Sequence, residues 1–147
     1  MPARLDSVAK FICEEGNWRV ANLQLQKVLY LAQMLYMGQN DGQRLTEASF
    51  EAWDYGPVEP RLYRQVRMFG WSPIEDVFFR ARRFGVEDAR RAFLSGVCNN
   101  LLPMKPSELV EITHWENGAW AKNYVEGARG VPIPDADILA EYRERAR

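Results

Sequence analysis

Cysteine and histidine are scarce in this sequence. Its 147 residues include two cysteines, Cys13 and Cys98, and one histidine, His114. Two cysteines are too few for a disulfide scaffold, and their apolar neighbours predict reduced core residues in a cytoplasmic protein. We expect no metal site, because zinc takes about four ligands, mostly from Cys and His. The common phosphate-binding and nucleophile motifs are missing as well, so we expect no cofactor and no enzyme activity.

Long hydrophobic runs and an excess of one charge are also missing. No window approaches the roughly 18 apolar residues of a membrane span, and an acid stands where a signal peptide would begin its apolar run. Twenty acidic and 19 basic residues leave a net charge of -1, so we expect no specific nucleic-acid partner. Because 47% of the residues are apolar, the chain can form one packed domain over residues 1–147.

Charge is unevenly distributed along the chain. Residues 41–60 carry a net charge of -4, and residues 61–91 carry +4 with eight arginines. Two interpretations remain open: neighbouring segments neutralise one another on a solvated surface, or a basic face attracts an acidic partner.

Helical patterns dominate the sequence and predict a mainly α-helical, single compact domain of about six to seven helices. The expected helices cover residues 5–15, 22–37, 60–69, 87–101, a segment from Pro106 toward His114, a short segment from Trp120, and 135–145. The 22–37 helix is apolar most of the way round, which predicts a central position. Alternation over 49–54 predicts a strand, and the β-prone residues 75–79 are its possible partner in a short ribbon.

The segment from Trp53 to Tyr63 (the corner) contains Gly56, Pro57 and Pro60 between aromatic residues. Glycine permits backbone angles closed to other residues, and proline fixes its own φ, so the chain is locked into a rigid turn from strand to helix. Two roles remain open: the corner wedges against the central helix, or it presents rigid aromatic side chains to a partner.

Four polar residues accompany this corner. We expect Gln26 or Gln33 to bond its backbone, because buried amides must be paired. Lys27 is costly to bury, so it should reach an acid such as Asp54 or emerge at the surface. For His114 we expect a structural role, with the imidazole between Trp115 and Trp120 and bonded to a backbone carbonyl.

Several of these residues carry a family likeness. The segments that carry it are Leu25–Gln33, Ala52–Tyr63, Leu109 with Thr113-His114 and Trp120, and Ile133-Pro134 with Tyr142. In this order, over about residues 7–142, they closely resemble the Panacea domain, the SocA-like or GepA-like phage-associated family of prokaryotic antitoxins. The arginine-rich stretch from Arg80 to Arg91 follows no motif of that family.

The resemblance implies a binding protein that neutralises a cognate toxin, usually encoded beside it, by direct contact. A second reading is an adaptor that delivers the toxin to a ClpXP-type protease. A third is a nucleic-acid-binding regulator that uses the arginines between 80 and 91. We predict partner contacts at Trp53, Tyr55, Pro57, Val58, Arg61, Tyr63, Arg64 and Arg67. The residues expected to support the structure are Gln26, Lys27, Gln33, Gly56, Pro60, His114 and Trp120.

Overall fold

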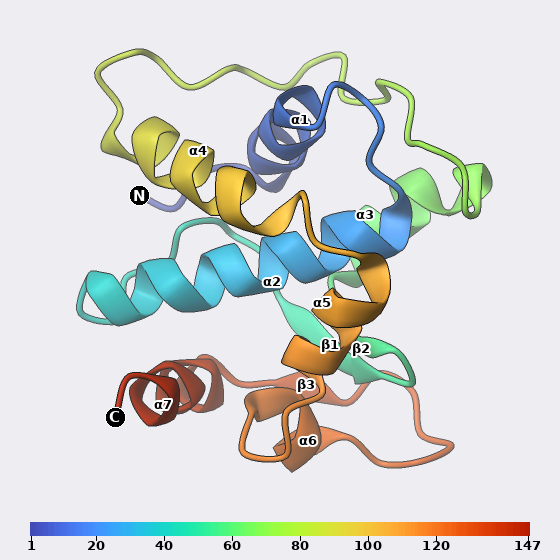
Figure 1. Ribbon diagram of the computed structural model, residues 1–147, viewed down its shortest axis with the longest axis vertical. Helices are drawn as coiled ribbons and strands as arrows, with labels where there is room; N and C mark the ends of the chain where they lie inside the picture. The colour runs from blue at the N-terminus through green and yellow to red at the C-terminus, as the bar shows by residue number, and fades with distance from the viewer.

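The computed structural model, which describes all residues 1–147, consists of seven α-helices and a small sheet that lies on one side of the central helix (Figure 1). The elements are α1 (Leu5–Glu15), α2 (Asn22–Gln39), β1 (Phe50–Trp53), β2 (Gly56–Val58), α3 (Pro60–Val66), the 3-10 turn η1 (Arg67–Phe69), α4 (Ala89–Leu101), α5 (Pro106–Thr113), α6 (Ala119–Asn123), β3 (Pro132–Ile133) and α7 (Asp135–Arg145). The predicted mainly α-helical class is confirmed.

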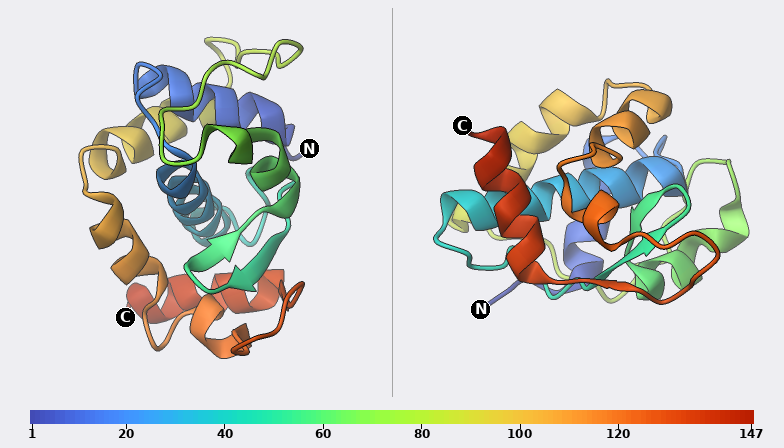
Figure 2. Two further views of the ribbon diagram at one scale, coloured as in Figure 1. Left: turned by 90° about the vertical axis from the view of Figure 1, so that its right-hand side faces the viewer. Right: turned by 90° about the horizontal axis from the view of Figure 1, so that it is seen from below.

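Helix α2 is the centre of the fold, as its apolar sequence predicts. It packs against α1, α4, α5, α7 and β2, and the view along its axis shows these elements around it (Figure 2). Side chains from most of the elements join in one cluster of 30 buried apolar residues. Both cysteines are buried in that core as free thiols, and burial raises the pKa of each to about 12. None of the helices could cross a membrane.

The sheet differs from the predicted ribbon. Strand β1 lies between β2 and β3, antiparallel to both, so its two edges are already occupied. The predicted pairing with residues 75–79 is therefore wrong, and that segment forms no strand. In a strand, side chains alternate between the two faces, so Asp76 would point inward together with Phe78. Instead, Asp76 is exposed and pairs with Lys10 at 3.2 Å. Residues 74–78 pass over the core as an irregular segment anchored by the buried Ile74 and Phe78.

Candidate partner-binding site

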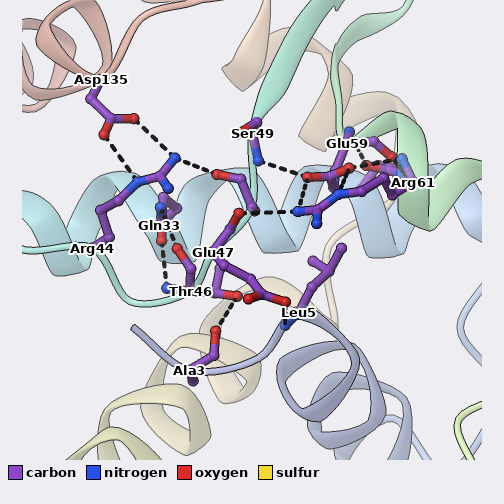
Figure 3. Close-up of polar contacts among 12 residues, drawn as sticks. Ala3, Leu5, Gln33, Arg44, Thr46, Glu47, Ser49, Glu59, Arg61 and Asp135 are labelled. Carbon is purple, nitrogen blue, oxygen red and sulfur yellow. Dashed lines mark hydrogen bonds and ion pairs between the residues drawn. The ribbon is translucent and has the colours of Figure 1, made fainter. Parts of the chain in front are cut away.

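Two glutamines of α2 hold the chain on either side of β1. The amide of Gln26 makes two bonds to the backbone of Glu59, donating at 3.2 Å and accepting at 2.8 Å. Gln33, two turns further along the helix, makes the same pair of bonds with Thr46, at 3.2 and 3.1 Å (Figure 3). The expected bond from α2 to the corner is confirmed for Gln26, whereas Gln33 holds the segment before β1.

Lys27 lies under the corner with no exposed surface. Its Nζ donates to the carbonyl of Pro57 at 3.0 Å and forms no ion pair. The expectation that it reaches an acid or the surface is wrong, because the turn after β1 exposes Asp54, whose carboxylate accepts the hydroxyl of Tyr124 at 2.6 Å. Burial without a counter-ion lowers the pKa of Lys27 to about 7.

Gly56 is required where β2 passes over Lys27. Its φ is +110°, a conformation that L side chains rarely adopt. A Cβ at this position would lie 3.1 Å from both Lys27 Nζ and Thr113 Oγ1. The unusual backbone angle expected before Pro57 is therefore present, and it lets the hairpin lie close to α2 and α5.

A buried carboxylate joins the corner to α3. Glu59 accepts from the backbone of Ser49 at 2.6 Å and of Arg61 at 2.8 Å, so it caps the helix that opens with Pro60. Its charge is balanced by the guanidinium of Arg61 at 3.2 Å (Figure 3). Sequence reasoning missed this role of Glu59, although an acid directly before a helix-initiating proline is a signal for a cap.

His114 is stacked on Trp120, with ring centroids 3.9 Å apart and planes within 1°. The expected position between two tryptophans is wrong, because Trp115 instead lies beneath the guanidinium of Arg145. Burial, and then the charge of Lys27, lower the pKa of His114, and a backbone hydrogen bond with Tyr55 partly opposes them. Trp120 Nε1 donates to the carbonyl of Trp53 at 2.6 Å, so this stack supports the hairpin from α6.

A cavity of about 710 Å³ opens beside the corner. Its walls come from the first turns of α2, the β1–β2 hairpin, α3 with η1 and the turn after it, and residues 127–129. It brings together five of the predicted contact residues, which are Trp53, Tyr55, Val58, Tyr63 and Arg67. Pro57 is buried and does not line the cavity. Arg61 and Arg64 line a separate depression of about 440 Å³.

The cavity also contains residues that sequence reasoning missed. Trp71 follows the Gly70 stop of η1 and is 84% exposed, and it lines the cavity with the predicted contact residue Tyr55, which is 70% exposed. Arg129 comes from the loop after α6, 62 positions from Arg67 in sequence. A tryptophan in a turn was a possible signal for Trp71, because a large apolar side chain there has no helix face to bury it. Nothing in the sequence pattern pointed to Arg129.

Ion pairs within the protein neutralise part of the positive charge of the arginine-rich stretch. Arg83 binds Glu14 at 2.6 Å, and Arg90 binds Asp88 at 2.7 Å. Arg80, Arg82 and Arg91 take part in no ion pair. Asp88 belongs to this stretch itself, whereas Glu14 belongs to α1, so the Arg83–Glu14 pair is the one that neutralises part of the local charge from another segment.

The comparisons with known proteins agree with the resemblance. The family model "Antitoxin SocA-like, Panacea domain" matches residues 25–121, a stretch that contains most of α2, the corner and the His114–Trp120 stack. The chain belongs to this family of SocA-like Panacea-domain proteins. The curated relative "Antitoxin SocA" of Caulobacter vibrioides (strain NA1000 / CB15N) is 30% identical over 113 residues. That similarity covers 69% of this chain and 58% of the relative. No solved structure matches.

Proposed function

We propose that this protein is the antitoxin of a toxin–antitoxin pair and that it neutralises its toxin by direct binding, without catalysis, with residues 1–147 acting as one domain. The observation that carries the proposal is the family match over residues 25–121. The antitoxin relative supports it, and extending that role to this chain is part of the proposal.

The interior chemistry fits a binding role. Its buried carboxylates are engaged in internal hydrogen bonds: Glu59 caps α3, and Glu141 accepts from the Tyr30 hydroxyl at 2.7 Å and the Ala119 amide at 2.9 Å. The accessible aromatic side chains lie instead at the cavity beside the corner, where Tyr55 and Trp71 are exposed. Tyrosine, tryptophan and arginine are the residues that most often dominate binding energy at protein interfaces. We therefore place the toxin contact at this cavity.

Co-expression with the product of the adjacent gene tests the proposal. That product should arrest growth when expressed alone, be harmless with this protein, and co-purify with it. Tyr55→Ala should weaken toxin binding about tenfold or more while leaving the thermal midpoint nearly unchanged, because Tyr55 is exposed. Phe79→Ala is the matched control, since Phe79 is an 81% exposed aromatic residue away from the cavity. Arg64→Ala measures whether the contact also extends over the depression beside α3.

Two outcomes would redirect the proposal. A harmless neighbour that does not bind this protein would contradict it. A toxin that is degraded faster in cells containing this protein would favour the protease adaptor, because simple neutralisation leaves toxin lifetime unchanged or longer.

A further inference from the structure

We propose that the cavity beside the corner receives an acidic segment of the toxin that carries an apolar side chain, with Arg67 and Arg129 binding its carboxylates. This inference rests on the proposed function and adds the chemistry of the partner's contact.

Two cations in the cavity have no carboxylate partner within the chain. Arg67 belongs to η1 and Arg129 to the loop after α6, and both are exposed. Neither forms an ion pair, whereas Arg61, Arg83 and Arg90 are each paired with an acid of this chain. Guanidinium groups bind carboxylates through paired, charge-assisted hydrogen bonds. The two free arginines therefore favour a partner that supplies acids.

The acid within the cavity does not satisfy them. The carboxylate of Asp54 accepts a hydrogen bond from the hydroxyl of Tyr124 at 2.6 Å. This bond directs the carboxylate toward the end of α6. Lys27 contributes to the cavity wall, but its Nζ is bonded to Pro57 and its side chain has no exposed surface. The cavity consequently presents a surplus of positive charge to any incoming segment, and complementary charge speeds and orients association.

The apolar part of the predicted contact follows from four aromatic side chains. Trp53 and Tyr63 pack edge to face, 4.9 Å apart, in the cavity wall, so this part of the surface is already formed before binding. Tyr55 and Trp71 are exposed and can close over an inserted side chain. Aromatic rings bury large apolar area with little loss of conformational entropy.

A protein segment fits this charge distribution better than a nucleic acid does. Single-stranded nucleic acids also stack on aromatic rings, but they need a continuous basic groove that follows the phosphates. Here the exposed unpaired cations in the cavity are two arginines, because Lys27 is buried. Two carboxylates beside an apolar anchor match what the cavity offers.

Charge reversal tests the inference. The affinity of the adjacent-gene toxin would be measured by calorimetry for the wild type and for Arg67→Glu, Arg129→Glu and Arg80→Glu. Arg80 is the matched control, because it is exposed and unpaired but lies outside the cavity. We expect each cavity variant to bind about tenfold more weakly or worse, with a reduced dependence on salt, and the control to stay within about twofold of wild type. All variants should keep the wild-type thermal midpoint.

Reciprocal variants and competing ligands complete the test. Acid-to-lysine changes in the toxin should restore binding to Arg67→Glu or Arg129→Glu. If the toxin binds the wild type and both cavity variants equally, this inference is overturned while the antitoxin proposal stands. If the toxin does not bind the wild type at all, both are overturned. ATP and poly(dT) are the competing probes. If Arg67 and Arg129 are required for binding of either probe but not for binding of the toxin, the cavity is a nucleotide site.

Discussion

The ammonium group of Lys27 and the carbonyl of Pro57, 30 positions apart in sequence, are joined by a 3.0 Å hydrogen bond inside the protein. This bond ties the central helix to the hairpin and leaves a cationic group buried without a counter-ion. Replacing a buried charged group by an apolar one of similar size is often neutral or stabilising, because the cost of removing the charge from water disappears.

We expect Lys27→Met to make stability less dependent on pH. The folded pKa of about 7 lies below the ordinary lysine pKa of 10.5, so the unfolded chain binds more protons between these values. Wild-type stability therefore rises with pH across that window. The stability of the variant relative to wild type should therefore be highest near pH 7 or below and fall by a few kcal/mol toward pH 10. Urea unfolding at pH 6.5 and 10 measures the difference.

The comparison for this prediction is Lys122→Met, since Lys122 is mostly exposed and pairs with Asp137 at the surface. Its effect on stability should change little over the same range. An equal difference between Lys27→Met and wild type at both pH values would contradict the low folded pKa.

Two glycines within helices should respond in opposite ways to alanine. A Cβ on Gly38 of α2 would lie 2.1 Å from the ring of Tyr142 on α7, whereas one on Gly96 of α4 would meet open space. We expect Gly38→Ala to cost about 1–3 kcal/mol through overpacking, and Gly96→Ala to stabilise by up to about 1 kcal/mol through helix propensity. Thermal unfolding of both variants measures this, and similar effects of the two changes would contradict the close packing of α2 on α7.

The hydrogen bonds of the Gln26 side-chain amide should contribute more to stability than the volume of the side chain. Gln26→Met leaves the backbone N–H of Glu59 without a partner, whereas the Glu59 carbonyl keeps its bond from the Tyr63 amide at 2.9 Å. The change should cost about 1–3 kcal/mol. Gln65→Met provides the comparison, because Gln65 is exposed on α3 and should change stability by less than about 0.5 kcal/mol. Denaturant unfolding measures both values; equal effects would show that the two bonds contribute little to stability.

The helices were largely predictable, because their signals are local. The period of apolar residues over 22–37 indicated a helix that is buried all round, and the structure extends it to Gln39. The helix was expected to end at residue 37, but Gly38 lies inside it, close to the ring of Tyr142 on α7. Pro60 at the first position of α3 and Gly70 at the end of η1 were correct boundaries. The strand over 50–53 was also correct. Its partner β2 follows after two residues, but its partner β3 lies more than 70 positions later and could not be predicted locally.

The candidate site was predictable only in part for the same reason. Trp53, Tyr55 and Tyr63 stand together in sequence, so their shared surface could be anticipated. Arg129 joins them through the return of the chain after α6, a long-range contact without a sequence signal. The ion pair expected between Lys27 and Asp54 failed because the hairpin turn placed the carboxylate outside.

By itself, the sequence determined the helical class, the central helix and the stiff Gly-Pro turn, because periodicity, capping and allowed backbone angles act over a few residues. Tertiary structure alone decided that β1 pairs with β3, that Lys27 is enclosed without an acid, and which arginines remain free. Each of those outcomes depends on which distant surfaces meet when the core closes, and burial and charge pairing are properties of that arrangement rather than of any single segment.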